Sequence, residues 1–220
     1  MKVLITSGGT AEPVDGVRFL TNFSTGGTGA ALARELKRLG HEVVLLRSVR
    51  AQAAAEVKEY FFGSFDELDG TLKKLLSETN FDMVVHAAAV ADYKVARVCV
   101  DGREYADGEK AKIPSGARVN LTLEPTYKII DRLPGYAKNR PLIIGFKLTN
   151  AADEEQARQA AARVQADWVV HNDLTDIRAG RRLFSLYRAG RLEKQICGTP
   201  SLAAWLDALA ADVQKASNLI

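Results

Sequence analysis

Short apolar runs alternate with stretches of helical period along most of the chain. The runs predict strands at Lys2–Ser7, Glu42–Arg47, Val57–Phe62, Asp82–Ala88, Val119–Leu123, Leu142–Leu148 and Trp168–His171. Apolar residues at helical spacing predict helices at Gly27–Leu39, Asp66–Glu78, Thr126–Leu133, Asp153–Gln165 and from Thr199 to about residue 215. Strands that alternate with helices form parallel sheets covered on both faces. The pattern therefore predicts an α/β fold, with one Rossmann-like domain over residues 1–220 and a doubly wound, mostly parallel sheet.

Two segments depart from this alternation. Residues 94–118 are polar, charged and glycine-containing, with no sustained period. Connections of this length inside a compact domain are usually lids or disordered segments, so we predict a flexible loop there. Farther along the chain, Leu183–Arg188 and Leu192–Ile196 flank Ala189-Gly190-Arg191. This arrangement predicts a small β-hairpin flap over residues 183–196.

The composition is that of an ordinary globular protein, with 47% hydrophobic residues, 26% charged residues and a net charge of +3. Lysine and arginine are scattered, whereas a nucleic-acid-binding surface concentrates them in a stripe. No apolar run approaches the roughly 20 residues of a membrane span. The two cysteines and three histidines have no metal-ligand spacing. We therefore expect a cytoplasmic protein without protein-bound metal, nucleic-acid partner or membrane anchor.

Three glycine-rich or polar segments follow predicted strands, at Ile5–Gly29, His86–Tyr93 and Ile144–Leu148. Open α/β sheets bind their ligands at such strand ends. Gly26 and Gly29 precede a helix, where backbone amides and the helix dipole can hold a phosphate, and the Ser24 hydroxyl can add a donor. The alternative is a tight turn that needs glycine only for its geometry.

Single polar residues near these strand ends are candidates for ligand contacts. Asp92 follows small residues that include Ala88 and Ala89, so a flat group can lie against the backbone beside the carboxylate. Asn22 can orient a carboxylate or carbonyl group, Arg18 can bind phosphate, and Lys112 in the long loop can neutralise developing phosphate charge. The structural alternatives are a helix cap for Asp92, an Asx-turn for Asn22 and solvated surface side chains for the two cations.

Two further strand ends carry candidates. Phe146 either stacks on a base or belongs to the core, and Lys147 beside it is harder to explain as a core residue. Asn172 either contacts a ligand or forms part of a turn. The sequence alone leaves both alternatives open.

Other nucleotide-binding motifs fit the chain less well. The absence of G-x-x-x-x-G-K-[ST] excludes a P-loop. The segment Thr25–Ser48 resembles the opening of a short-chain dehydrogenase, with Arg47 where a reader of a 2′-phosphate sits. Those enzymes resemble one another in a Tyr-x-x-x-Lys pair, and no tyrosine here has a lysine four residues later. An NAD(P)-dependent oxidoreductase is therefore a weakened alternative.

Three motifs together resemble the phosphopantothenate–cysteine ligase family, also called phosphopantothenoylcysteine synthetases or the C-terminal domain of DNA/pantothenate metabolism flavoproteins. These motifs are Thr6–Thr10, Val17–Gly26 and Ala88–Tyr93, and the resemblance covers nearly the whole chain. It implies a homodimer that joins 4′-phosphopantothenate to cysteine in coenzyme A biosynthesis. It also implies CTP or ATP as co-substrate with Mg²⁺, because a nucleotide first activates the carboxylate as an acyl-nucleotidyl or acyl-phosphate intermediate.

The resemblance assigns roles to the positions that match the family's motifs. Catalysis falls to Asn22 and Lys112. Nucleotide contacts fall to Ser24, Gly26, Gly29, Ala88, Asp92, Pro125, Thr126, Tyr127, Lys128, Phe146, Lys147 and Asn172. Substrate contacts fall to Arg18, Asn22, Ala88, Ala89 and Asp92, partly across the dimer interface. In bacterial members Asp92 and the alanines before it are assigned to CTP, so the division between nucleotide and substrate stays open there.

The chain departs from the family pattern in two places. The Gly-x-x-Gly turn commonly contains lysine or arginine, and here it reads Gly26-Gly27-Thr28-Gly29. This departure leaves a non-catalytic nucleotide-binding relative as an alternative. Many bacterial members also carry lysines on the helix after Gly-Phe, where this chain has Ala160 and Val164. Because Met1 begins the first strand, we expect the flavin-dependent decarboxylase of many bacterial members to be a separate partner.

Overall fold

A mostly parallel sheet forms the centre of the computed structural model, which describes residues 1–105 and 112–217. Among these residues the sheet has eight strands, in the order β13-β12-β11-β10-β6-β1-β4-β5. Their bounds are β1 Lys2–Ser7, β4 Glu42–Ser48, β5 Lys58–Phe62, β6 Met83–His86, β10 Leu142–Thr149, β11 Trp168–Asp173, β12 Leu183–Arg188 and β13 Arg191–Cys197. The antiparallel pairs of this sheet are β11 with β12 and β12 with β13, and its other neighbouring strands are parallel. The predicted doubly wound α/β fold is confirmed.

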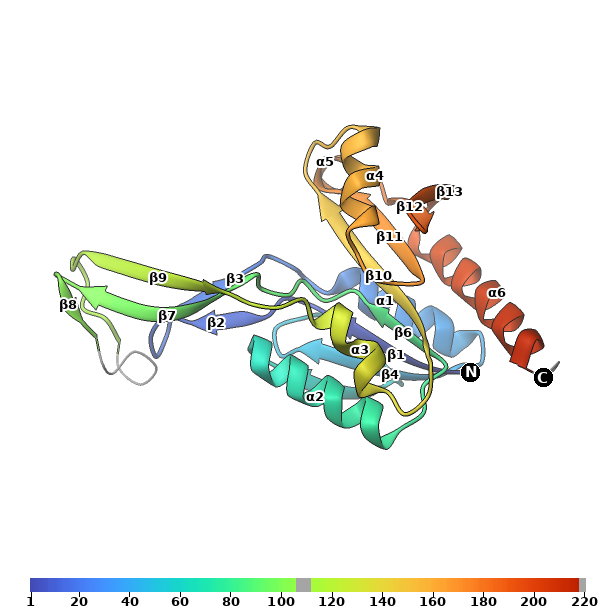
Figure 1. The fold of residues 1–220 in the computed structure, drawn as a ribbon, viewed down its shortest axis with the longest axis horizontal. Helices are drawn as coiled ribbons and strands as arrows, with labels where there is room; N and C mark the ends of the chain where they lie inside the picture. The colour runs from blue at the N-terminus through green and yellow to red at the C-terminus, as the bar shows by residue number, and fades with distance from the viewer. Residues whose placement is uncertain (106–111, 218–220) are drawn as a thin grey trace.

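The central strands carry apolar residues on both faces of the sheet, so helices cover both faces. One face carries α1 (Gly27–Arg38) and α6 (Thr199–Ser217). The other carries α2 (Phe65–Glu78), the 3₁₀ turn η1 (Ile129–Arg132), α3 (Leu133–Tyr136) and α4 (Glu154–Ala162) (Figure 1). Since α1 leads from β1 to β4 and α2 leads from β5 to β6, the winding direction changes between β1 and β6. Ligands of open α/β sheets bind at the carboxyl ends of the strands at such a point.

A three-stranded antiparallel arm projects from the sheet domain (Figure 1). It consists of β7 (Tyr93–Val100), β8 (Arg103–Glu104) and β9 (Val119–Pro125). The prediction of a flexible loop over residues 94–118 is therefore wrong for its first part, which is strand, and residues 106–111 lie outside the described residues. The pattern hid β7 because an irregularity in pairing between Val95 and Arg97 interrupts the alternation of side chains.

The predicted hairpin forms, but it is not a flap. β12 pairs with β11 as well as with β13, so residues 183–196 widen the main sheet. Phe184 and Leu186 of β12 are buried in the same core cluster as residues of α6. The sequence shows the turn between the two strands, but the pairing with β11 is a long-range contact that local sequence does not reveal.

Two other segments differ from the predicted elements. The polar stretch after β1 contains two short paired strands, β2 (Ala11–Pro13) and β3 (Phe19–Thr21). Residues 126–128 were expected to begin a helix and are not helical. The Thr126 amide and hydroxyl instead donate to the carbonyl oxygens of Asp92 and Ala91, at 2.9 and 2.7 Å.

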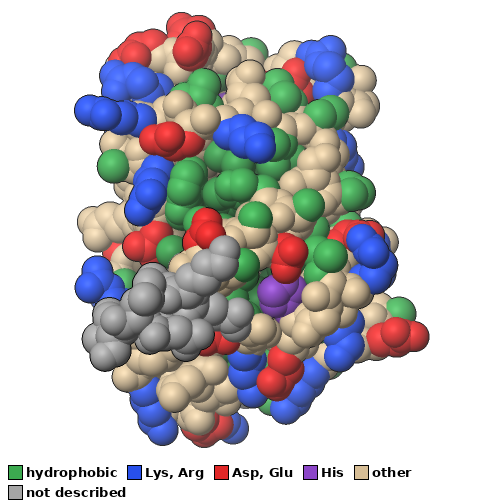
Figure 2. Space-filling model, turned by 90° about the vertical axis from the view of Figure 1, so that its right-hand side faces the viewer, with side chains coloured by type: hydrophobic (Ala, Val, Ile, Leu, Met, Phe, Trp, Pro, Cys, Tyr) green, Lys and Arg blue, Asp and Glu red, His purple; other side chains and the backbone are tan. Residues whose placement is uncertain are grey.

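The surface agrees with the scattered charges of the sequence. Basic and acidic side chains are mixed around a hydrophobic centre on the face shown in Figure 2. Cys99 is half-buried, Cys197 is exposed, and both are free thiols. None of the helices in the described ranges combines the length and apolar character needed to span a bilayer.

Phe184→Ala is expected to lower the free energy of unfolding by about 3–5 kcal/mol, because it deletes a core ring and leaves a cavity. The ring is 1% exposed. Leu192→Ala, on the other strand of the hairpin and 40% exposed, is the matched control and should cost less than about 1 kcal/mol. Chemical denaturation measures both changes. Equal, small losses would mean that the hairpin is a flap after all.

Candidate functional site

A cleft of ≈ 350 Å³ opens at the carboxyl ends of β6 and β10. It lies beside the point where the winding direction of the sheet changes. The segment after β6 forms one wall, η1 and the residues before it form a second, and the end of β10 with the end of α4 forms a third. Six residues predicted to contact ligands line it: Ala88, Asp92, Tyr127, Lys128, Phe146 and Lys147. Segments distant in sequence are thus brought to one site.

Hydrogen bonds from the end of β1 hold the wall that follows β6. The Ala88 amide donates to Thr6 Oγ1 at 3.1 Å, and the Ala91 amide donates to Thr10 Oγ1 at 2.9 Å. Between them, the Thr10 amide donates to the Ala89 carbonyl oxygen at 3.2 Å. The small residues after β6 therefore follow the backbone of the neighbouring strand end.

The second wall is anchored through Tyr127. Its hydroxyl donates to Asp69 Oδ2 at 2.7 Å, and the Arg132 guanidinium lies 3.4 Å from the centre of its ring. Burial and the hydrogen bond to Asp69 raise the pKa of Tyr127, so the phenol stays protonated. The neighbouring ion pair between Lys128 and Asp92 is exposed and contributes little to stability. A ligand can therefore replace this pair without disturbing the wall.

Asn22 lies against the outer side of the segment that follows β6. Its Nδ2 donates to the Val90 carbonyl oxygen at 3.2 Å, and the residue is exposed. A Cβ at Gly9 would lie 2.5 Å from the Asn22 carbonyl oxygen, so glycine is required for this approach. The structure thus places Asn22 next to Ala89 and Val90, as the prediction of a shared site requires, but not in the lining of the cleft.

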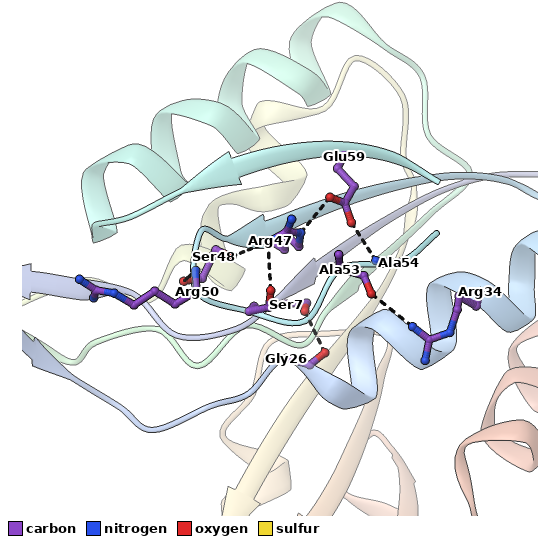
Figure 3. A network of polar contacts seen from close by, with 10 residues as sticks. Ser7, Gly26, Arg34, Arg47, Ser48, Arg50, Ala53, Ala54 and Glu59 are labelled. Atoms are coloured by element: carbon purple, nitrogen blue, oxygen red, sulfur yellow. Dashed lines mark hydrogen bonds and ion pairs between the residues drawn. The ribbon is translucent and has the colours of Figure 1, made fainter. Parts of the chain in front are cut away.

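The glycine turn before α1 packs tightly against the sheet. Gly26 has a φ of 71°, and a Cβ there would lie 2.7 Å from both Ala51 Cβ and Ser7 Oγ. A Cβ at Gly29 would lie 2.5 Å from Ser7 Cβ. Ser7 Oγ donates to the Gly26 carbonyl oxygen at 3.1 Å (Figure 3), and Ser24 Oγ accepts from the Gly26 amide at 3.4 Å. Both glycines have a packing role, and neither lines the cleft.

Arg47 is held by the protein itself. Its Nε donates to Glu59 Oε2 at 2.9 Å (Figure 3), and its Nη1 donates to the Ala51 carbonyl oxygen at 3.0 Å. The guanidinium also lies 4.8 Å from the centre of the Phe61 ring. These contacts fix the loop that packs on the glycine turn, where a dehydrogenase binds its dinucleotide. The oxidoreductase alternative therefore loses the arginine that favoured it.

Asp15, which the sequence analysis missed, connects the segments that carry Arg18 and Lys112. Its buried carboxylate accepts from the backbone amides of Val17, Arg18 and Ile113, and from Arg18 Nη1 at 2.5 Å. Burial acts in the opposite direction, but these hydrogen bonds hold the pKa of Asp15 at about 2. Lys112, next to Ile113, is exposed. Neither Arg18 nor Lys112 lines the cleft.

Asn172 belongs to a different cavity, of ≈ 270 Å³. The next residue, Asp173, caps α5 (Leu174–Arg178) by accepting from the Thr175 amide at 2.8 Å. It also accepts from the Ala151 amide at 3.0 Å and from Thr149 Oγ1 at 2.6 Å. Asn172 itself lies within β11 (Trp168–Asp173) and not in a turn, and the structure does not bring it to the cleft.

Several lining residues were missed by the sequence analysis, among them Arg163 and His86. Arg163 follows α4 and lines the cleft together with Ala160 and Val164. Residues about one helical turn apart share a face of a helix, so the spacing between Ala160 and Arg163 could have identified Arg163 from the sequence. His86 ends β6, and Thr6 Oγ1 lies 3.0 Å from its Nδ1. Burial lowers the pKa of His86 to about 4, so the ring is neutral near pH 7.

The donor set of the cleft suits a metal that arrives with a substrate. The described residues contain no cluster of three or more His, Cys, Asp or Glu that could hold a metal ion. Asp92 and Asp131 nevertheless line the cleft. Mg²⁺ is commonly held by one or two carboxylates together with substrate phosphates, and this donor set fits that mode.

Comparison with known proteins decides the family. The profile of the DNA/pantothenate metabolism flavoprotein C-terminal domain matches residues 1–183. The chain belongs to this family. The coenzyme A biosynthesis bifunctional protein CoaBC of Thermococcus kodakarensis is 35% identical over 181 residues, which is 79% of this chain and 41% of that protein. The CoaBC protein of Bacillus subtilis is 30% identical over 191 residues, or 81% and 41% of the two chains. This member thus spans less than half the length of these curated relatives.

Two solved structures have the same fold as this chain. The DNA/pantothenate metabolism flavoprotein from Streptococcus pneumoniae aligns with a TM-score of 0.81 and 26% identity, covering 96% of this chain and 99% of that one. A Cab2 variant in complex with phosphopantothenate-cysteine aligns with a TM-score of 0.76 and 20% identity, covering 99% and 88%. These matches confirm the Rossmann-like fold that the motifs implied.

Proposed function

We propose that this protein is a phosphopantothenate–cysteine ligase, which joins 4′-phosphopantothenate to cysteine in a reaction driven by CTP or ATP. The observation that carries the proposal is the cleft at the change of winding direction. It gathers residues predicted to contact ligands from three separate segments: Ala88 and Asp92, Tyr127 and Lys128, and Phe146 and Lys147. The relatives named for coenzyme A biosynthesis support the pathway. A cytoplasmic location fits these small polar substrates, and a separate flavin-dependent decarboxylase is a predicted partner.

The cleft offers different surfaces to the two ends of a nucleotide. Ile130 and Phe146 supply apolar surface for a base. Lys147 and Arg163 line the cleft, and neither makes an ion pair with another described residue. Two cations that form no ion pair within the described part of the chain suit a triphosphate, whose charge they can neutralise. They also supply positive charge that the Gly26–Gly29 turn lacks in this chain.

The proposed chemistry needs no protein nucleophile. A carboxylate oxygen of phosphopantothenate attacks the α-phosphorus of CTP and displaces pyrophosphate, or attacks the γ-phosphorus of ATP and displaces ADP. The cysteine amine then attacks the acyl carbon, loses a proton and releases CMP or phosphate. Cations near the phosphates stabilise the charge that develops on the phosphoryl oxygens. Mg²⁺ held by the phosphates with Asp92 and Asp131 would supply further charge neutralisation.

Asn22 and the Arg18–Lys112 region are proposed to act on the pantothenate side. The Asn22 amide, fixed to Val90, can orient the activated acyl group for attack. Arg18 is oriented by Asp15 and keeps 43% of its side chain exposed, so its outer face can bind the phosphate of the substrate. Because Arg18 and Lys112 do not line the cleft of their own protomer, their participation fits a site completed by a second protomer.

The arm supports such a homodimer. β9 is an edge strand among the described residues of the arm, with one side free of backbone pairing. Val119, Leu121 and Leu123 alternate along it, so they share one face, and they are 39%, 38% and 40% exposed. An exposed apolar row on an open edge is normally covered in a native protein. We propose that a second copy of this chain covers it.

The function is tested by supplying phosphopantothenate, cysteine and either CTP or ATP, and following pyrophosphate or phosphate release. Wild-type protein should turn over with at least one nucleotide. Lys112→Ala should lower turnover by about 100-fold or more with an unchanged denaturation midpoint, because Lys112 is exposed. Silence of folded wild-type protein with both nucleotides would contradict the ligase. Nucleotide binding without turnover would instead select the non-catalytic relative.

Arg163→Gln is expected to weaken binding of the productive nucleotide by about 10- to 100-fold, since one charge-assisted contact is lost. Arg158→Gln on the same helix is the matched control, because Arg158 pairs with Glu155 and does not line the cleft. Isothermal titration calorimetry measures both affinities. Equal affinities for the two variants would remove Arg163 from the phosphate site.

Leu121→Asp is expected to convert the protein from a dimer to a species of 23.9 kDa in sedimentation experiments, because it places charge in the apolar row. Leu192→Asp, at a similarly exposed leucine of the main sheet, should leave the dimer intact. A wild-type protein that sediments only as a monomer would exclude the proposed interface.

A further inference from the structure

His86 is a buried titratable group of the cleft that the proposed chemistry does not use. Its side chain is 6% exposed, and it lies at the end of β6 in register with Gly145 of β10. It lines the cleft together with Ala88, Ile130 and Phe146. Buried polar atoms are nearly always hydrogen-bonded, so the partners of the two ring nitrogens indicate where the proton lies.

The Nδ1 atom has its partner in Thr6. Thr6 Oγ1 lies 3.0 Å from Nδ1 and already accepts the Ala88 amide at 3.1 Å. The threonine hydroxyl has one proton, and among the described residues Nδ1 is the acceptor available to it. The hydroxyl therefore donates to Nδ1, which must be unprotonated. In a neutral imidazole the proton then lies on Nε2, and Nε2 is a donor.

The Nε2 atom has no partner among the described residues. Nε2 is also not fully enclosed. Among the described residues, the buried side-chain atom without a hydrogen-bond partner is Asn139 Oδ1, so an unpartnered Nε2 must be partly accessible. Because His86 lines the cleft, the accessible part of its ring faces that space. The cleft thus contains a fixed, uncharged N–H donor at its buried end.

The surroundings of His86 indicate which part of a ligand it meets. Ala88 and Ile130, which pack on the same core cluster, make the cleft apolar there. The charged groups that line the cleft are Asp92, Lys128, Asp131, Lys147 and Arg163, and all of them are exposed or half-exposed. A phosphate belongs with those cations, whereas an uncharged donor beside apolar side chains suits an uncharged acceptor on a flat ring.

We propose that His86 binds the base of the nucleotide, donating a hydrogen bond from Nε2 to an acceptor atom of the ring. The proposal rests on the function proposed above, in which the cleft holds CTP or ATP. Cytosine and adenine both present suitable acceptors, a carbonyl oxygen or ring nitrogens. His86 is then a residue that recognises the base, and the cations recognise the phosphates.

The test compares nucleotides with inorganic tripolyphosphate, which has the phosphates but no base. His86→Met removes the donor at similar volume and should weaken CTP or ATP binding by about tenfold, with tripolyphosphate binding unchanged. His86→Gln retains a donor and should recover part of the affinity. His41→Gln is the control, because His41 pairs with Asp207 at 2.9 Å beside α6, away from the cleft.

Each other outcome overturns the proposal. Unchanged nucleotide affinity in His86→Met would mean that the ring contacts no part of the nucleotide. Equal weakening of tripolyphosphate binding would mean that it contacts phosphate instead. If wild-type protein binds tripolyphosphate but neither nucleotide, the base has no site in the cleft. If the ligase turns over and the His86→Met variant keeps its nucleotide affinity, the role of His86 is refuted and the proposed function stands.

A spectroscopic measurement keeps the proposal testable if His86→Met fails to fold. The chain has three histidines, so ¹⁵N NMR of histidine-labelled wild-type protein can resolve each ring. The His86 ring should be neutral and protonated on Nε2 from roughly pH 5 to 8, and its Nε2 signal should move on adding CTP or ATP but not tripolyphosphate. Three results would contradict the assignment: a proton on Nδ1, titration of the ring with a pKa of about 6.5, or no response of the Nε2 signal to nucleotide.

Discussion

The hydrogen bonds that join the strand ends of β1 and β6 beyond the sheet are the contacts on which the site depends. The Ala88 amide donates to Thr6 Oγ1 at 3.1 Å and the Ala89 amide to the Gly8 carbonyl oxygen at 2.8 Å. Asn22 and Thr126 then attach to the same segment from two other loops. Because this segment is bound to a rigid parallel strand pair, one wall of the cleft is formed before any ligand arrives, which lowers the ordering cost of binding.

The positions of charge and of apolar surface give the cleft its proposed polarity. The Asp92–Lys128 pair is solvent-exposed and easily exchanged, while Lys147 and Arg163 make no ion pair with other described residues. His86 contributes a neutral group at the buried end. The glycine turn of this chain has no basic residue, and its tight packing against Ser7 and Ala51 gives it a structural role. The proposed phosphate site therefore relies on the end of β10 and on α4.

The sequence predicted the central strands because both faces of a parallel sheet select continuous apolar runs. It missed β7, whose irregular pairing breaks the alternation, and it could not show that the hairpin joins β11. Among site residues, strand-end motifs identified Ala88, Asp92 and Phe146, because strand ends are positions that local pattern reveals. Arg163, His86 and Asp15 were missed because their roles arise from long-range contacts. Arg163 lies at a helix end that faces β10, and the partner of His86 is on β1. Asp15 binds a loop nearly a hundred residues away along the chain.

A crystal structure with a non-hydrolysable analogue of the nucleotide that supports turnover locates the nucleotide site directly. The analogue should lie in the cleft, with its phosphates toward Lys147 and Arg163 and its base between Ala88 and Phe146. An analogue bound instead on the loop over the Gly26–Gly29 turn, or in the cavity that Asn172 lines, would show that the cleft is not the nucleotide site.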